Sequence, residues 1–218
     1  MNAPYRPHYF PDEAEMKQSR ARYLDYLPPE GRILDLGSGR GEFLELLQKS
    51  GRIGQGVEID PDLVEICRNE GFMIEHDDAL SFLKRKTHKD WDAIFIGHLI
   101  EHLPAPAAIE LLNMATDKLK PKGRLIILTP NPNFLPGRGS FWSDLTHLRP
   151  YPLDGLKSFL THAGFRIVDC GVTPESKLRV DWQHPLGSLI NLLRLFVLRL
   201  IMLEEYDGGE IFIVGERQ

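Results

Sequence analysis

Residues 33–43 read Ile33-Leu34-Asp35-Leu36-Gly37-Ser38-Gly39-Arg40-Gly41-Glu42-Phe43. The order is an apolar strand that ends near an acid, a turn with spaced glycines, and the start of a helix. Glycine lets the backbone come close to a ligand, and the first turn of a helix offers free N–H groups. The stretch therefore predicts a nucleotide-cofactor loop, although a turn that binds no ligand can have the same pattern.

Strands and helices alternate along the rest of the chain. The spacing of apolar residues and the turn signals predict strands at 32–36, 54–59, 72–75, 92–96, 124–129, 165–172 and 210–215. Helices are predicted at 12–27, 42–49, 61–69, 105–119 and 153–163. Parallel strands need a crossover, which a helix normally supplies. We therefore predict an α/β fold with a Rossmann-like, mostly parallel seven-stranded sheet, helices on both faces, and ligands at the carboxyl ends of the strands.

Length and charge limit the class of protein. The 218 residues fit a single domain over 1–218, with an N-terminal helical extension at 1–29 and an apolar helical insertion at 174–208 before the last strand. The hydrophobic content of 42% and the charged content of 26% are ordinary for a globular protein. The net charge of -5 argues against DNA as a partner, because proteins that neutralise phosphates usually carry a basic excess.

The cysteines and the first residues bear on the cellular compartment. Cys67 and Cys170 lie in different predicted elements and form neither a disulfide framework nor a cysteine-rich metal site. Residues 1–8 lack the apolar core of a signal peptide. We therefore expect a cytoplasmic protein.

Acids follow the second and third predicted strands. Glu58 ends the second strand, where a carboxylate can accept hydrogen bonds from both hydroxyls of a ribose. Asp77 and Asp78 follow the third strand, where a carboxylate can accept from an adenine amino group or cap the next helix. A solvated carboxylate at a strand end is the alternative for Glu58.

The glycine loop and these acids together resemble the class I S-adenosylmethionine-dependent methyltransferase family, over about residues 30–170. The segments 91–98 and 119–124 resemble the fourth strand of that family and the turn before its fifth strand, where Lys122 replaces the more common glycine. The resemblance implies S-adenosylmethionine as the cofactor. It also implies cofactor contacts at Asp35, Gly37, Ser38, Gly39, Glu58, Ile59, Asp78, Ala79 and His98.

In that family Asp35 and the loop glycines would line the methionine part of the cofactor. Glu58 would hold the ribose, Ile59 would pack on the adenine, and Asp78 with the Ala79 backbone would meet its edge.

A nicotinamide dehydrogenase is the nearest rival class of enzyme. Its fingerprint needs a glycine three residues after Gly39, where this chain has Glu42. A carboxylate at a helix start would oppose a pyrophosphate there. The methionine part of S-adenosylmethionine carries an ammonium and a sulfonium, which suit an acid such as Asp35. The charges therefore favour the methyltransferase.

Residues 98–102 read His98-Leu99-Ile100-Glu101-His102, which matches the H-x-x-E-H spacing of one class of zinc peptidases. No third ligand is evident downstream, so we expect no metal. The same residues resemble the Glu-His-Leu that borders the substrate pocket of many methyltransferases. A packing role for Glu101 and His102 is the alternative.

The loop at 141–151 contains Trp142-Ser143-Asp144-Leu145-Thr146-His147-Leu148-Arg149-Pro150. It resembles a subgroup of methyltransferases associated with O-antigen and other cell-surface polysaccharides. Aromatic faces stack on sugar rings, and Asp144 and Arg149 offer directional hydrogen bonds. The loop therefore predicts a glycan, sugar-phosphate or lipid-linked saccharide acceptor bound by Trp142, Asp144 and Arg149. His147 or His102 would remove a hydroxyl proton.

Three alternatives to this interpretation stay open. A polar network around Asp144, His147 and Arg149 could hold the loop against the sheet. The acceptor could be a quinone-type or other small aromatic compound, since such enzymes share the central motifs. The fold could also serve as a non-catalytic binding module.

Residues 189–203 contain twelve apolar residues interrupted by Asn191, Arg194 and Arg199, which is unlike a membrane-spanning helix. On a helix the polar residues fall on one side and leave a wide apolar face. This pattern predicts contact with the inner surface of a membrane, a homodimer interface, or packing over the core.

Overall fold

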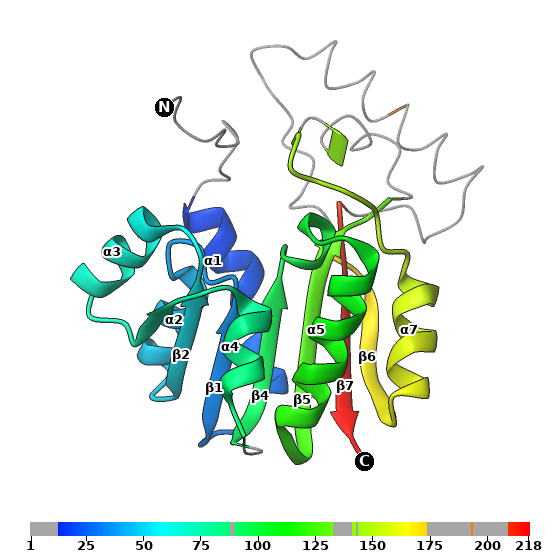
Figure 1. The fold of residues 1–218 in the computed structure, drawn as a ribbon, viewed down its shortest axis with the longest axis horizontal. Coiled ribbons are helices and arrows are strands. Elements are labelled where there is room, and N and C mark those ends of the chain that lie inside the picture. Colours follow the sequence, from blue (N-terminus) through cyan, green and yellow to red (C-terminus); the bar gives the residue numbers. More distant parts are fainter. Residues whose placement is uncertain (1–12, 88–89, 133–140, 143, 174–192, 194–208) are drawn as a thin grey trace.

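The computed structural model describes residues 13–87, 90–132, 141–142, 144–173, 193 and 209–218. Its centre is a seven-stranded sheet in the order β3-β2-β1-β4-β5-β7-β6 (Figure 1). The strands are β1 Arg32–Leu36, β2 Ile53–Glu58, β3 Ile74–His76, β4 Trp91–Gly97, β5 Leu119–Pro130, β6 Phe165–Thr173 and β7 Glu210–Arg217. All neighbouring pairs are parallel except those of β7, which runs antiparallel to β5 and β6. The predicted mostly parallel sheet is confirmed.

Helices cover both faces of the sheet, as predicted (Figure 1). The helical elements are α1 Glu13–Ala21, η1 Arg22–Tyr26, α2 Glu42–Lys49, α3 Pro61–Asn69, α4 Ala79–Arg85, η2 Ile100–His102, α5 Ala105–Lys118 and α7 Leu153–His162. One apolar layer joins α4, α5 and α7 to the sheet, and the other joins η1 and α2 to it. Strand β4 serves both layers because its side chains alternate: Ile94 and Ile96 face the first, Ala93 and Phe95 the second.

Some element boundaries differ from the prediction. The helix predicted at 12–27 is α1 followed by the 3₁₀ helix η1, and α4 was not predicted as an element. Strand β5 begins at Leu119 because this residue pairs with Trp91. The turn expected in segment 119–124, before the fifth strand, is therefore an irregularity within β5. These differences leave the order of strands and helices unchanged.

Lys122, which stands where the family usually has glycine, has a left-handed backbone with φ 64°. This conformation costs an L-residue roughly 1–2 kcal/mol and costs glycine little, while glycine adds about 0.5–1 kcal/mol of chain entropy on folding. Lys122→Gly is therefore expected to raise the free energy of unfolding by about 0.5–1 kcal/mol in urea titrations. Lys118→Gly, at the end of α5, is the matched control and should lower it by a similar amount. A Lys122→Gly protein less stable than the parent would contradict this account of the turn.

The described residues end on either side of the predicted helical insertion at 174–208, apart from Leu193. Residues 1–12 of the predicted extension at 1–29, and most of 189–203, also lie outside the described part, so membrane-surface contact and the homodimer remain predictions. Among the helices that the structure does describe, none has both the length and the apolar character that crossing a membrane requires.

Candidate active site

The glycine turn lies between β1 and α2, at the carboxyl end of the sheet. The backbone N–H groups of Gly37 and Ser38 both donate to the carbonyl of Val57 on β2, over 2.9 and 3.1 Å. Gly41 caps α2 with φ 84°, and a Cβ there would lie 2.8 Å from the Phe72 ring. Glycine is therefore required at this position both by the torsion and by the space. The predicted loop is present, and β2 holds it in place.

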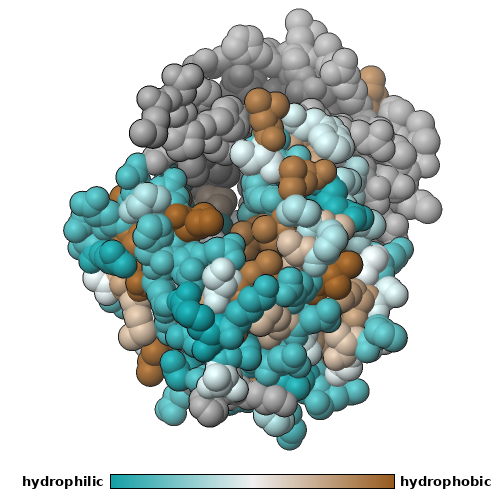
Figure 2. Space-filling view, viewed as in Figure 1, coloured by the Kyte–Doolittle hydropathy of each residue, from teal (hydrophilic) through white to brown (hydrophobic). Residues whose placement is uncertain are grey.

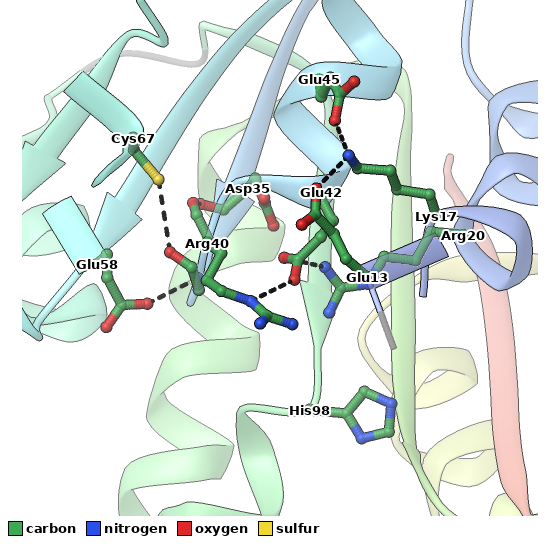
Figure 3. Close-up of polar contacts among 12 residues, drawn as sticks. Glu13, Lys17, Arg20, Asp35, Arg40, Glu42, Glu45, Glu58, Cys67 and His98 are labelled. Carbon is green, nitrogen blue, oxygen red and sulfur yellow. Dashed lines mark hydrogen bonds and ion pairs between the residues drawn. The ribbon is translucent and has the colours of Figure 1, made fainter. Parts of the chain in front are cut away.

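Glu58, which ends β2, fixes the loop with its carboxylate. Oε2 accepts from the Gly39 N–H at 2.9 Å, and Oε1 accepts from the N–H groups of Ile59 and Asp60, each at 2.9 Å. Figure 3 shows the carboxylate turned towards the loop. The side chain is buried and hydrogen-bonded, so the alternative of a freely solvated carboxylate does not hold. Next to it Ile59 is 64% exposed, which leaves an apolar surface outside the core.

Asp35 lies beneath the loop with 1% of its surface exposed. Its Oδ2 is buried without a hydrogen-bond partner among the described residues. Burial raises the pKa of Asp35 to about 7, and Glu42 and Glu58 add to the rise, while the Arg20 guanidinium opposes it. An unpartnered buried carboxylate is costly unless a cation meets it. The ammonium and sulfonium of S-adenosylmethionine are such cations, so the site fits this cofactor.

Glu42 begins α2 and is paired with two arginines. Its Oε2 lies 3.3 Å from Arg20 Nη1 of α1, and its Oε1 lies 3.1 Å from Arg40 Nε (Figure 3). Lys17 also links α1 to α2 through Glu45. The negative charge that the sequence placed at this helix start is therefore largely compensated. The missing fingerprint glycine still argues against a dinucleotide, but repulsion by Glu42 contributes less than we expected.

Asp78 precedes α4 and caps it. Its Oδ1 accepts from the Ser81 N–H at 2.9 Å, which is the capping role that the sequence left open. The neighbouring Asp77 accepts from the Asp78 N–H at 2.9 Å and pairs with Arg85. Ala79 is the first residue of α4. Contact of Asp78 and Ala79 with an adenine remains a prediction.

His98 follows β4 with a left-handed backbone, φ 54°. Its Nε2 lies 2.6 Å from Glu210 Oε1 of β7, and its Nδ1 lies 3.2 Å from Glu101 Oε1. Burial alone would lower the pKa of His98, but the two carboxylates outweigh it and raise the pKa to about 10. Both ring nitrogens are engaged within the protein, so a direct cofactor contact by His98 remains a prediction. Sequence reasoning missed Glu210, whose partner lies more than a hundred residues away.

The predicted bases His102 and His147 come together. Their ring centroids lie 4.7 Å apart, although one belongs to η2 and the other to the loop after β5. His102 Nδ1 lies 2.9 Å from Thr146 Oγ1, and that hydroxyl lies 2.6 Å from Asp144 Oδ1. Burial lowers the pKa of His102, against the opposing effect of Glu101. Sequence reasoning missed Thr146, although the Asp-x-Thr-His order in the loop contained it.

Three other residues were predicted to bind the acceptor. One of them lies beside the two histidines, and the other two lie nearer the surface. Asp144 lies beside the histidines, with its Oδ2 3.7 Å from His147 Nε2. Trp142 is 61% exposed and packs edge-on against Phe141, and Arg149 lies over the Tyr151 ring. Figure 2 shows apolar residues that interrupt the hydrophilic surface towards the end of the molecule where the parallel strands end.

The H-x-x-E-H segment does not form the paired histidines of a zinc peptidase helix. His98 lies outside η2, and its ring turns to Glu101 and Glu210. Glu101 is fully buried, and its Oε2 accepts from Thr129 Oγ1 at 3.1 Å. Its carbonyl accepts from the Leu148 N–H at 2.8 Å, which holds the loop at 144–149 against η2.

Comparison with known proteins places this site in a family. A family model described as "Methyltransferase domain" matches residues 6–169. A ubiquinone biosynthesis O-methyltransferase of Xylella fastidiosa (strain 9a5c) is 32% identical over 118 residues, which are 50% of this chain and 47% of that protein. A second enzyme so described, from Coxiella burnetii (strain Dugway 5J108-111), is 29% identical over 106 residues, 47% of this chain and 44% of its own length. The chain thus spans about half the length of the curated relatives that it matches.

Solved structures agree over nearly the whole chain. A SAM-dependent methyltransferase from Archaeoglobus fulgidus superposes with a TM-score of 0.77 at 28% identity, covering 94% of this chain and 95% of that one. A Burkholderia thailandensis 1,6-didemethyltoxoflavin-N1-methyltransferase, 16% identical, superposes with a TM-score of 0.64 over 95% of this chain and 80% of its own, which shows the fold alone. With the family model matching most of its length, the chain belongs to the methyltransferase domain family and contains a class I S-adenosylmethionine-dependent methyltransferase domain.

Proposed function

We propose that the enzyme methylates a hydroxyl oxygen of a small aromatic, quinol-type acceptor. The observation that carries this proposal is the pair of histidine rings, His102 and His147, whose centroids lie 4.7 Å apart next to the cofactor end of the sheet. Leu99, three residues before His102, lies against Gly37 of the cofactor loop. The ubiquinone biosynthesis O-methyltransferases among the relatives support an aromatic acceptor.

The cofactor would lie across the carboxyl ends of β1, β2 and β4. Asp35 would face the cationic methionine part, and the backbone at Gly37, Ser38 and Gly39 would line it. Glu58 would accept from the ribose, with Ile59 under the adenine, Asp78 and Ala79 at its edge, and His98 on the side of β4.

The hydrogen bonds around His102 leave one of its ring nitrogens able to accept a proton. The Thr146 hydroxyl has one hydrogen, which it donates to Asp144 Oδ1, so it accepts from Nδ1 of His102. This chain of hydrogen bonds leaves the lone pair of His102 Nε2 free. When the acceptor oxygen attacks the methyl carbon, its O–H proton moves to Nε2, the carbon–sulfur bond breaks, and S-adenosylhomocysteine leaves. The protein otherwise contributes mainly by aligning oxygen and methyl group.

The acidity of the acceptor favours an aromatic hydroxyl. A phenol has a pKa of about 10, within reach of an imidazole whose ordinary pKa is about 6.5. A sugar hydroxyl is much less acidic and would need a stronger base than a histidine held neutral. The glycan acceptor that the loop at 141–151 predicts remains the second candidate, because Trp142 offers an exposed aromatic face to a sugar ring.

A methyl-transfer assay with labelled S-adenosylmethionine tests this proposal. Catechols and quinols with and without an isoprenoid tail should accept label, whereas sugar nucleotides and lipid-linked saccharides should not. His102→Ala should lower kcat by about 10²–10⁴-fold and leave cofactor affinity within about twofold. His162→Ala, an exposed histidine of α7, is the matched control. Transfer to saccharides alone would overturn the aromatic acceptor, and an unchanged kcat in His102→Ala would remove the base.

A further inference from the structure

Glu101, His102 and His147 form a cluster of three metal-binding side chains. One carboxylate oxygen and one ring nitrogen from each histidine lie within 4.8 Å of one another. No third ligand follows the 98–102 motif closely in sequence, but folding brings His147 to it from the loop after β5. We propose that these three residues bind a divalent transition-metal ion of the Zn²⁺ class. The site does not depend on the identity of the acceptor.

Hydrogen bonds fix both histidine rings in the form that binds a metal. His147 Nδ1 lies 2.8 Å from the Phe141 carbonyl, which can only accept, so Nδ1 carries the hydrogen and Nε2 carries the lone pair. His102 is fixed in the same way by Thr146, whose own hydrogen goes to Asp144. In metal sites, a ligating histidine donates its other N–H to a carbonyl or a carboxylate-linked group in this manner. The cluster therefore has its supporting hydrogen bonds already in place.

The charges around the cluster suit a dication. Glu101 is fully buried, Glu210 meets the far side of His98, and Asp144 stands behind Thr146. Glu101 and Glu210 face one imidazolium, that of His98, and the Arg20 guanidinium also acts on Glu210. A divalent ion would add positive charge between Glu101 and the two histidines, and this charge would reduce the cost of burying Glu101.

Ligand type and geometry point to zinc rather than magnesium. Imidazole nitrogens suit Zn²⁺, Co²⁺ and Ni²⁺, whereas Mg²⁺ prefers oxygen ligands. A tetrahedral zinc ion holds its ligand atoms about 3.4 Å apart, so ligand atoms that lie within 4.8 Å of one another would have to approach by up to about 1.4 Å. Two histidines and one glutamate leave a fourth position open, as in zinc enzymes that act on a bound oxygen.

An ion at this site would take the lone pair that His102 offers to a proton. The acceptor hydroxyl would then bind the ion in the open position, which lowers the pKa of the hydroxyl, and its proton would pass to water. Attack on the methyl group and departure of S-adenosylhomocysteine would follow as before. Methyl transfer to an aromatic hydroxyl is compatible with the metal-free site and with the metal-bound site. Metal binding and acceptor identity can therefore be tested separately.

Cobalt binding to the full-length, tag-free protein tests the site. After removal of metal with a chelator and of the chelator by dialysis, Co²⁺ should bind in a one-to-one ratio and give the intense visible absorption of four-coordinate cobalt, which Zn²⁺ should abolish. His102→Ala and His147→Ala should each weaken binding on the order of 100-fold or more. Thr146→Val, which removes only the support of His102, should weaken it by about 10–100-fold. His162→Ala and His76→Ala, both exposed, should leave it unchanged.

Circular dichroism and S-adenosylmethionine binding show whether each variant is folded. Loss of cobalt binding in folded His102→Ala and His147→Ala supports the site. The absence of a four-coordinate spectrum, or a spectrum that persists in both variants, overturns it. If cobalt does not bind while His102→Ala still loses turnover on a quinol, the metal proposal fails and the proposed function stands.

Discussion

Replacing Asp35 by asparagine is expected to stabilise the protein while weakening its binding of S-adenosylmethionine. Burial raises the pKa of Asp35 from 3.8 to about 7, so keeping this group ionised at pH 8 costs on the order of 4 kcal/mol of folding free energy. A buried asparagine without partners costs about 1–3 kcal/mol of its own. We therefore expect the free energy of unfolding at pH 8 to rise by about 1–3 kcal/mol.

The same replacement removes the anion that would face the methionine part of the cofactor. Breaking a buried ion pair costs about 3 kcal/mol or more, which corresponds to a loss of affinity on the order of 100-fold. Urea titration measures the first effect and calorimetry of cofactor binding the second. Asp35→Asn protein that is less stable than the parent at pH 8, or that binds the cofactor as tightly, would contradict this role of Asp35.

The pH dependence gives a further check on Asp35. Because its pKa in the folded protein lies above that in the unfolded chain, the folded state holds an extra proton between about pH 4 and pH 7. The contribution of Asp35 to stability therefore falls as pH rises through this window, and Asp35→Asn should lose this slope. Cofactor affinity should change in the opposite direction: it should weaken as pH falls below about 7 in the parent, because the carboxylate must be ionised to meet the cation.

Glu58→Ala is expected to weaken S-adenosylmethionine binding by on the order of 100-fold and to lower the free energy of unfolding by about 2–3 kcal/mol. The carboxylate accepts three backbone N–H bonds, from Gly39, Ile59 and Asp60. A hydrogen bond to a charged group contributes about 1.5–3 kcal/mol, and part of this is recovered when water reaches the freed N–H groups. The loop would lose its fixed position as well as the acid proposed to hold the ribose.

Glu65→Ala is the matched control, because Glu65 is an exposed glutamate on α3 close to Glu58 in sequence. It removes the same charge and should change stability by less than about 0.5 kcal/mol, with cofactor affinity unchanged. Calorimetry and urea titration measure both variants. Equal cofactor affinity in Glu58→Ala and Glu65→Ala would show that Glu58 serves the loop alone.

The parts of the molecule that could be predicted from the sequence are those that depend on residues close together in the chain. The cofactor loop was predictable because strand, glycines and helix start are contiguous between Ile33 and Phe43. The start of β5 was not, because it depends on pairing between Leu119 and Trp91. Helix α4 is short, and three of its seven residues are polar, so its apolar periodicity is weak.

In the candidate site, too, single residues were predicted from local patterns, whereas contacts between distant parts of the chain were not. His102 and His147 were proposed separately as bases, but no local pattern indicated that their rings would meet. Arg20 reaches Glu42 from another helix, and Glu210 reaches His98 from the last strand. Contacts of this kind follow from the packing of distant elements, and a single sequence contains no periodicity that reports them.

The place of β7 has a consequence for how the enzyme is made. This strand lies between β5 and β6, yet it is synthesised after both. While the ribosome is still adding residues before 210, β5 and β6 have open edges with unpaired backbone groups, which favour aggregation. Glu210, the partner of His98, arrives with the same strand. We therefore expect the nascent chain to need protection from aggregation until β7 has been synthesised. The contact between Glu210 and His98 can form only then.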